Sequence, residues 1–335
     1  MMKKVQNSPE SLVQDELEGY VKLHRDKIRL LPDTTCVVRA VPKEKGKVKL
    51  VMGNGAGHEP AVIGWVGEGM FDMNVVGDVF TAPSGEKILK GLQAIDDGSP
   101  ILLIVQNHAG DVLNAGQAYR KAKKQGMNIR QVIFYDDIAS APRDAVEERR
   151  GIGGMFFYTK IVGAMAEAGA TLEECAAMFE RVRDCTRTYA AAFSSCTNPV
   201  NGVKMFEYLE GTNQIELGMG VHGEGGGENQ IEMPSASVLA ERMARALLED
   251  KPYQKGDRLL VDINGAGSTT CMEMNIFYNE LEKFLTAEGF PVVGAVAGNF
   301  LTTQELAGIS LSFCSVDEEM LRLWQAPCRS GILTR

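Results

Sequence analysis

The chain has 335 residues, 44% hydrophobic and 24% charged, which predicts about two globular domains and excludes wholesale disorder. Its net charge of −9, from 35 basic and 44 acidic residues, argues against a broad nucleic-acid-binding face. There is no signal-peptide pattern, no run near the roughly 18 apolar residues of a membrane span, and no CxxC pair among seven cysteines, so we expect a cytoplasmic protein without a metal site.

The first part of the chain alternates between helical and strand patterns. Ser8, followed by Pro9 and Glu10, predicts the start of a helix over 9–24. Short apolar or β-branched runs predict strands, and periodic stretches between them predict helices. The strands are 35–39, 48–52, 73–79, 101–106 and 129–135, and the helices are 84–95 and 115–125. This alternation is typical of a mainly parallel sheet with helices on both faces.

The stretch 154–193 has a helical pattern, and within it Thr171 and Glu174 form a capping box. The turn-rich segment 193–202 then marks a crossover. Strands at 214–219, 258–263, 292–296 and 309–315 and helices at 236–249, 270–287 and 317–325 follow. We therefore predict two α/β domains, 1–190 and a smaller α/β sandwich over 191–335, with the C-terminal tail packing on the first domain.

A glycine-rich segment, Gly53-Asn54-Gly55-Ala56-Gly57-His58-Glu59-Pro60, follows the predicted strand 48–52. A turn of this kind at the carboxyl end of a strand exposes backbone N–H groups where α/β folds bind ligands. The spacing differs from the dinucleotide fingerprint G-x-G-x-x-G, and no P-loop lysine follows. His58 suits proton transfer better than a pyrophosphate cradle, although a plain turn is the alternative interpretation.

A second segment, Gln106-Asn107-His108-Ala109-Gly110-Asp111, follows the apolar strand 101–106. Asp111 is expected near the start of a helix, where it is either an N-cap carboxylate or a base for a substrate hydroxyl. Because both segments follow parallel strands, we expect Asp111 and His58 at the same sheet edge.

A third segment, Glu216 to Glu228, contains His222 among many glycines. Neutral imidazole near pH 7 can act as a metal ligand, a base or a nucleophile. The glycines leave little local packing to bury the ring, so a purely structural histidine is the weaker alternative.

Three motifs in this order resemble the dihydroxyacetone-binding K subunit of dihydroxyacetone kinases. They are Gly55-Ala56-Gly57-His58-Glu59-Pro60, Asn107…Gly110-Asp111 and Gly220-Val221-His222-Gly223-Glu224. Supporting stretches lie at 77–81, 149–154, 216–220 and 301–310. The resemblance spans nearly the whole chain.

The resemblance implies that His222 forms a covalent hemiaminal with the ketone carbon of the substrate. It also implies that His58 and Asp111 contact the substrate hydroxyls and move protons. The full set of implied substrate-binding residues is Gly55, Ala56, Gly57, His58, Gln106 and Asp111.

The resemblance further implies a homodimer that holds neither nucleotide nor metal. A separate helical, nucleotide-binding L-type subunit would carry ADP or ATP with Mg²⁺ and donate the phosphoryl group. A phosphotransferase-system protein would recharge that subunit in many bacteria.

The chain departs from the family pattern at several positions. Gln106 stands where the family has a lysine, and the third motif continues as Gly225-Gly226 where the family has Pro-Gly. These changes suit a divergent paralogue that takes another small ketose such as erythrulose, or a non-catalytic ketose-binding coactivator. A dinucleotide-dependent oxidoreductase is a third class, because Asp72 and Asp78 lie near the spacing of a ribose-binding acid, but His58-Glu59-Pro60 is foreign to that motif.

Overall fold

The computed structural model describes residues 3–225, 227, 229–250 and 253–335, so Gly226 of the third motif lies outside the described residues. The chain divides into two compact units. The N-terminal unit contains residues 3–134, 157–181 and 322–335, and the C-terminal unit contains 135–156 and 182–321. The predicted single boundary at residue 190 falls inside a strand, β8, so the compact units do not follow it.

The N-terminal unit is built on a six-stranded sheet of order β1-β2-β5-β3-β6-β7. Its strands are β1 (Ile28–Leu30), β2 (Cys36–Arg39), β3 (Lys49–Ala56), β5 (Met73–Val79), β6 (Ile101–Gln106) and β7 (Ile129–Phe134). The four strands β5, β3, β6 and β7 are parallel, and β2 and β1 add antiparallel at one edge. The mainly parallel sheet is therefore confirmed.

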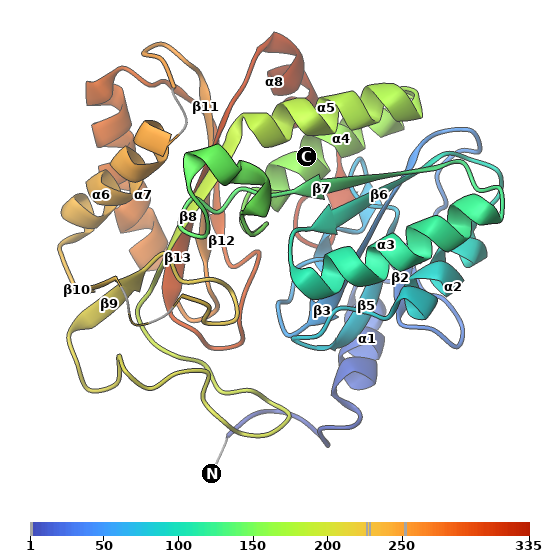
Figure 1. Cartoon of the computed structure of the whole chain (residues 1–335), viewed down its shortest axis with the longest axis horizontal. Coiled ribbons are helices and arrows are strands. Elements are labelled where there is room, and N and C mark those ends of the chain that lie inside the picture. The colour runs from blue at the N-terminus through green and yellow to red at the C-terminus, as the bar shows by residue number, and fades with distance from the viewer. Residues whose placement is uncertain (1–2, 226, 228, 251–252) are drawn as a thin grey trace. The chain divides into compact units, whose positions relative to one another are not determined.

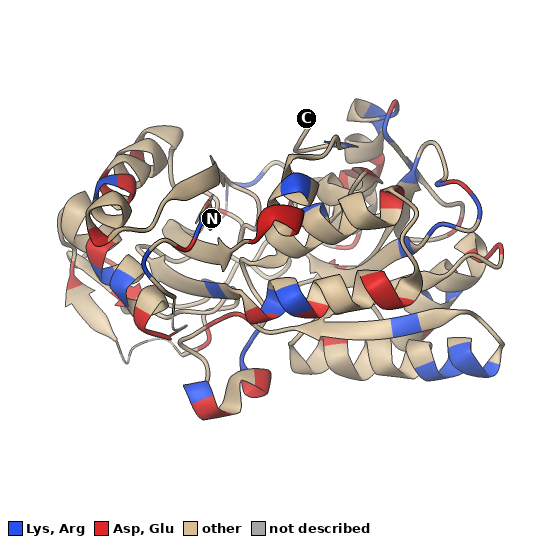
Figure 2. Cartoon of the chain, turned by 90° about the horizontal axis from the view of Figure 1, so that it is seen from above, with Lys and Arg blue, Asp and Glu red and all other residues tan. Residues whose placement is uncertain are grey.

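Helices cover both faces of this sheet, as predicted. On one face, α2 (Gly85–Ile95) and α3 (Ala109–Lys124) pack side by side on apolar residues of the strands (Figure 1). Toward the other face, Tyr158 of α4 (Met155–Glu167) contacts Phe134 of β7 and Phe179 of α5 (Leu172–Asp184), with ring centroids 5.2 and 5.1 Å apart. Because both faces of the sheet are covered, its strands carry few charged residues. Charged residues gather instead on helices and loops (Figure 2).

The ends of the chain both belong to the N-terminal unit. Helix α1 (Leu12–Leu23) buries Leu17 and begins three residues later than predicted, because its N-cap is Ser11 rather than Ser8. At the C-terminus, β14 (Arg329–Ser330) pairs with β4 (Gly67–Glu68), so the tail packs on the N-terminal unit, as expected. None of the helices in the described ranges combines the length and the apolar character that a membrane crossing requires.

The C-terminal unit contains a second six-stranded sheet, of order β10-β9-β8-β13-β11-β12. Its strands are β8 (Thr186–Ala192), β9 (Gln214–Leu217), β10 (Gln230–Glu232), β11 (Leu259–Gly265), β12 (Val292–Gly298) and β13 (Gly308–Ser315). Only the β11–β12 pair is parallel. Helices α6 (Ala236–Asp250) and α7 (Cys271–Glu288) bury one face, and α8 (Glu318–Gln325) follows β13.

The opposite face of this second sheet is unusually polar. Buried side chains on it include Asp262 and Asn264 of β11 and Ser312 of β13. Asp136 accepts hydrogen bonds from the backbone N–H groups of Ile152 and Gly154, both at 2.7 Å, and from Thr188 of β8. This carboxylate therefore ties the segment 150–154 to that polar face.

The sequence did not predict the short strands β1, β4, β10 and β14. The other predicted helices and strands agree with the structure to within a few residues, with two exceptions. The predicted helical stretch 154–193 ends at Asp184, and Thr186–Ala192 forms β8, because antiparallel pairing with β13 and β9 outweighs the helical propensity of its alanines. Helix α3 begins at Ala109 rather than at 115, behind an N-cap residue, His108, that makes no side-chain capping bond.

Candidate functional site

The glycine-rich segment of the N-terminal unit is partly strand rather than turn. β3 runs through Gly53, Asn54 and Gly55 to Ala56, and the chain turns at Gly57 with φ of +100°. A Cβ at Gly55 would lie 2.6 Å from the backbone nitrogen of Thr81, so only glycine lets the segment after β5 lie against β3. The predicted turn therefore begins four residues later than the sequence suggested.

Hydrogen bonds from buried side chains fix the shape of this loop. Both carboxylate oxygens of Glu59 accept the Gly57 N–H, at 2.9 and 3.0 Å. Burial raises the pKa of Glu59, against the lowering effect of these backbone hydrogen bonds. Below the loop, Asn54 binds the Gly55 carbonyl oxygen and accepts a 2.8 Å bond from Asn74 of β5. The sequence analysis did not identify Asn74, which lies 20 residues away.

His58 projects from this loop with 6% of its surface exposed. Its ring contacts that of Phe80, with centroids 5.2 Å apart. Phe80 adopts a positive φ of 55°, and its N–H donates to the carbonyl oxygen of Ala56 at 2.8 Å, which holds it beside β3. The aromatic contact restricts the imidazole of His58 to one side of the loop.

The second predicted segment lies at the end of the neighbouring parallel strand. Gln106 is the last residue of β6 and is 8% exposed, and Asp111 is half-buried in the first turn of α3. Asp111 is therefore inside the helix rather than its N-cap. β3 and β6 pair in parallel from Lys49–Ile101 to Met52–Ile104. The structure thus brings the His58 loop and the Gln106–Asp111 segment to the same edge of one sheet, as predicted.

In the C-terminal unit, His222 lies in the turn after β9 and is paired with Glu224. The Nδ1 atom of His222 lies 3.0 Å from Oε1 of Glu224, and the backbone N–H of His222 donates to Oε2 at 2.8 Å. Burial raises the pKa of Glu224, but the hydrogen bonds and charge of His222 outweigh this effect and lower that pKa to about 2. Glu224 is therefore ionised at neutral pH.

An ionised Glu224 determines which ring nitrogen of His222 is available for chemistry. A carboxylate accepts hydrogen bonds, so it holds the proton of a neutral imidazole on Nδ1. The lone pair of the ring then lies on Nε2, as a nucleophile or base requires. The sequence analysis quoted Glu224 as part of the motif without assigning it this role.

Arg150 anchors the turn that carries His222. Its guanidinium donates to the carbonyl oxygens of Gly218 at 3.1 Å and Glu224 at 3.2 Å, and it pairs with Asp137 at 2.7 Å. Asp137 is buried, and burial raises its pKa to about 6 although Arg150 opposes that rise. Arg150 thus connects the turn after β9 to the segment between β7 and α4.

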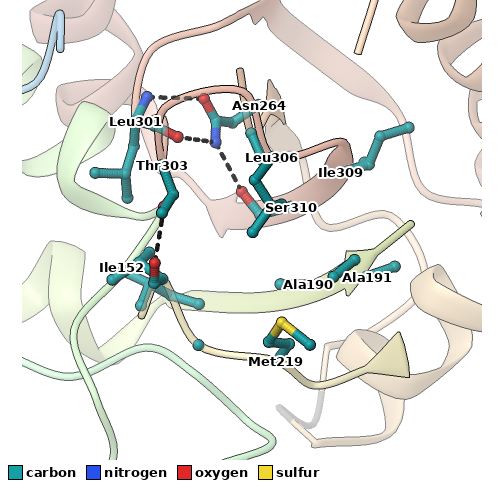
Figure 3. Close-up of a pocket in the computed structure, with 14 residues that line it drawn as sticks. Ile152, Ala190, Ala191, Met219, Asn264, Leu301, Thr303, Leu306, Ile309 and Ser310 are labelled. Carbon is teal, nitrogen blue, oxygen red and sulfur yellow. Dashed lines mark hydrogen bonds between the residues drawn. The ribbon is translucent and has the colours of Figure 1, made fainter. Parts of the chain in front are cut away.

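A small cavity of about 40 Å³ opens beside this turn within the C-terminal unit (Figure 3). Gly220 and Val221, the two residues before His222, line it together with Asn264, Thr303 and Ser310. Thr303 donates to the carbonyl oxygen of Val221 at 2.8 Å, and Asn264 donates to Leu301 and Ser310 at 2.7 and 3.2 Å. Thr303, in the loop between β12 and β13, therefore holds the backbone of the His222 turn.

Comparison with known proteins accounts for these motifs. The sequence matches the Dak1 domain over residues 18–331. The chain belongs to the Dak1 family. The resemblance found from the three motifs is thereby confirmed.

Several Dak1 proteins are similar to this chain along most of its length. The dihydroxyacetone-binding subunit of PTS-dependent dihydroxyacetone kinase 1 from Listeria innocua is 39% identical over 318 residues, with 95% of each chain covered. L-erythrulose kinase of Pectobacterium atrosepticum is 36% identical over 325 residues, which cover 96% of this chain but 54% of that protein. The solved structure of a dihydroxyacetone kinase operon co-activator matches with a TM-score of 0.88 at 26% identity, covering 95% of this chain and 97% of the other.

Proposed function

We propose that this Dak1 protein is the substrate-binding subunit of a dihydroxyacetone kinase, and that it holds the ketose as a hemiaminal on His222. The observation that carries the proposal is the 3.0 Å contact between Nδ1 of His222 and the ionised Glu224. It is supported by the similarity to a dihydroxyacetone-binding subunit whose whole length this chain nearly spans.

The proposed step is an addition that balances without a leaving group. Nε2 of His222 forms a bond to the carbonyl carbon of the ketose, and the π electrons of the carbonyl move to its oxygen. That oxygen gains a proton, and Nδ1 loses one. Glu224 stabilises the positive charge that develops on the ring meanwhile, because its carboxylate already accepts the Nδ1 proton in a hydrogen bond.

The other residues that the resemblance assigns to substrate binding belong to the N-terminal unit. His58 and Asp111 bind substrate hydroxyls and accept the proton of the phosphorylated one, and Gln106 and the backbone of 55–57 bind the remaining hydroxyls. Their place at the carboxyl ends of parallel strands, where α/β sheets bind ligands, supports these roles.

The phosphoryl group comes from a separate nucleotide-binding subunit. In this proposal the partner carries ADP or ATP with Mg²⁺, a phosphotransferase-system protein recharges it, and the present chain forms a homodimer. The "PTS-dependent" and "subunit" wording in the name of the Listeria innocua relative supports the partner and its source.

Dihydroxyacetone labelled with carbon-13 at its carbonyl carbon tests the central step. On binding to the wild-type chain, we expect the carbonyl signal to be replaced by that of a saturated carbon. His222→Ala should abolish the new signal, whereas His24→Ala, at the C-cap of α1, should leave it unchanged. A carbonyl signal that persists in the bound state would overturn the hemiaminal.

A second candidate function follows from Gln106, which is buried at the end of β6. Its amide offers an acceptor as well as donors, which suits a longer ketose such as erythrulose. The similarity to L-erythrulose kinase and to an operon co-activator supports a kinase for a four-carbon ketose or a non-catalytic sensor as the alternatives. A panel of ketoses, assayed with and without a phosphoryl-donor subunit, distinguishes these functions. A kinase subunit phosphorylates its preferred ketose when the donor is present, whereas a sensor binds the ketose but does not support its phosphorylation.

A further inference from the structure

The guanidinium of Arg150 directs one of its three nitrogens at Glu224, the carboxylate that lies against the ring of His222. Nε and Nη2 both bind Oδ2 of the buried Asp137, at 2.8 and 2.7 Å, and Nη2 also donates to the carbonyl oxygen of Gly218 at 3.1 Å. Nη1 donates to the backbone carbonyl oxygen of Glu224 at 3.2 Å and lies 3.8 Å from its side-chain Oε2 atom. Asp137 therefore fixes the orientation of the guanidinium, and the remaining nitrogen faces Glu224.

Gly220 makes this approach of the two charged groups possible. A Cβ at position 220 would overlap both Nη1 of Arg150 and Oε2 of Glu224. The guanidinium and the carboxylate thus meet in the space that a side chain at this position would occupy. Gly220 does not have a positive φ, so its backbone conformation is open to any residue. Glycine at position 220 therefore serves the contact between two side chains rather than the shape of the backbone.

The backbone of the turn has hydrogen bonds that do not involve Arg150. The Gly220 N–H donates to the carbonyl oxygen of Glu224 at 3.1 Å, and Thr303 donates to that of Val221 at 2.8 Å. These bonds remain when the guanidinium is removed. The side chain of Glu224, by contrast, loses the cation beside its Oε2 atom. The main effect of removing Arg150 therefore falls on the placement of the Glu224 carboxylate.

We propose that Arg150 is a positioning residue for the reaction on His222. Its guanidinium, in the space left by Gly220, holds the Glu224 carboxylate with Oε1 against Nδ1 of the imidazole. The ring then keeps its proton on Nδ1 and presents Nε2 to the ketose. This role rests on the proposed function, because the ketose is taken to add at Nε2, whereas the position of the ring proton can be measured without a ketose.

Nitrogen-15 NMR of the whole chain, labelled on its histidine rings, tests the position of that proton. The chain has four histidines, and the ring signal that His222→Ala removes is the one to follow. At pH 8, where a histidine ring is normally neutral, two-bond couplings distinguish a proton on Nδ1 from one on Nε2. We expect the Nδ1–H form in the wild type and a substantial share of the Nε2–H form in Arg150→Gln. Arg150→Lys keeps the charge and should preserve most of the wild-type tautomer.

Three further variants separate positioning from a general effect on the fold. Gly220→Ala forces the two charged groups apart without altering a charge, so it should move the ring proton in the same direction as Arg150→Gln. Arg149→Gln is the matched control, because it makes the same substitution one residue earlier, where the guanidinium binds Asp250 at 2.7 and 2.8 Å. Gly19→Ala adds the same methyl group at an open position of α1. Both controls should leave the tautomer unchanged.

Titration with carbon-13-labelled dihydroxyacetone connects the tautomer to the reaction. Arg150→Gln and Gly220→Ala should raise the ketose concentration that half-saturates the adduct about threefold to tenfold, because only rings with a free Nε2 react. Arg150→Lys should recover most of this loss.

Three results would each overturn the proposal: a wild-type His222 ring protonated on Nε2, a ring proton that stays on Nδ1 in both Arg150→Gln and Gly220→Ala, or an equal shift in Arg149→Gln. A wild-type chain that forms no adduct would refute the hemiaminal instead. The NMR of the unliganded variants would then still decide whether Arg150 positions the ring proton.

Discussion

Glu16 is a half-buried acid that weakens the fold as the pH rises. It lies on α1, and among the described residues its Oε2 atom has no hydrogen-bond partner. Burial, with a smaller contribution from the charge of Glu59, raises the pKa of Glu16 to about 8. We predict that Glu16→Gln stabilises the protein at neutral and alkaline pH.

The size of the effect follows from the difference between the folded and unfolded pKa values. The unfolded carboxyl ionises near 4.5, whereas the folded one keeps its proton to about pH 8. Between these values the folded state binds one more proton, so the free energy of unfolding falls by at most about 1.4 kcal/mol per pH unit. From pH 5 to pH 7 the wild type loses about 2–3 kcal/mol through this group at most. Glutamine is neutral throughout and removes that loss.

Urea unfolding of wild type and variant at pH 5, 6, 7 and 8 measures this difference. We expect nearly equal stability at pH 5, where a protonated glutamate resembles glutamine, and a growing advantage of Glu16→Gln above it. Glu18→Gln is the matched control, because Glu18 is exposed on the same helix and its pKa is lowered by hydrogen bonds from Gln14 and Lys22. A stability difference between wild type and Glu16→Gln that stays constant from pH 5 to 8 would refute the reasoning.

Three other substitutions test charges in the C-terminal unit. Glu224→Gln should weaken the carbon-13 adduct signal. In the wild type, the free energy of unfolding should fall as the pH drops from about 4.5 toward the folded pKa of Glu224, about 2, because the carboxylate becomes protonated. The variant should lack this loss. Burial raises the pKa of Asp262 well above its usual value. The thermal midpoint of the Asp262→Asn variant should therefore exceed that of the wild type more at pH 8 than at pH 5. Arg149→Leu breaks the buried bidentate pair with Asp250 and should cost about 2–4 kcal/mol in urea unfolding; a cost under about 0.5 kcal/mol would contradict this.

Local signals in the sequence predicted most of the first sheet, because its parallel strands are short apolar runs bounded by caps and turns. Ser84 accepts from the N–H of Lys87 at 3.2 Å, and Thr171 and Glu174 form the predicted capping box. β8 escaped prediction because its strand character comes from pairing with β13, more than a hundred residues away. Strand pairing over such distances leaves no mark within a window of ten residues.

The candidate site shows the same division between local and distant signals. His58, Asp111 and His222 stand in glycine-rich motifs that are visible in the sequence. The groups that orient them are distant: Asn74 reaches Asn54 across 20 residues, and Arg150 reaches Glu224 across 74. Such partners are determined by the sheet order, so they emerge only from the fold.

Position 106 tests whether the loop after β6 contacts substrate. The family places a lysine there, and its ammonium would hold a substrate hydroxyl through a charge-assisted hydrogen bond, roughly twice as strong as a neutral one. Gln106, 8% exposed at the end of β6, keeps a donor and loses the charge. We expect Gln106→Lys to tighten dihydroxyacetone binding several-fold, or by about 1 kcal/mol, in calorimetry, with adduct formation on His222 intact. Gln117→Lys, on the exposed face of α3, adds the same charge as a control and should change nothing. If Gln106→Lys weakens binding or matches that control, position 106 does not touch the ketose, and the assignment of Gln106 and Asp111 to substrate is wrong.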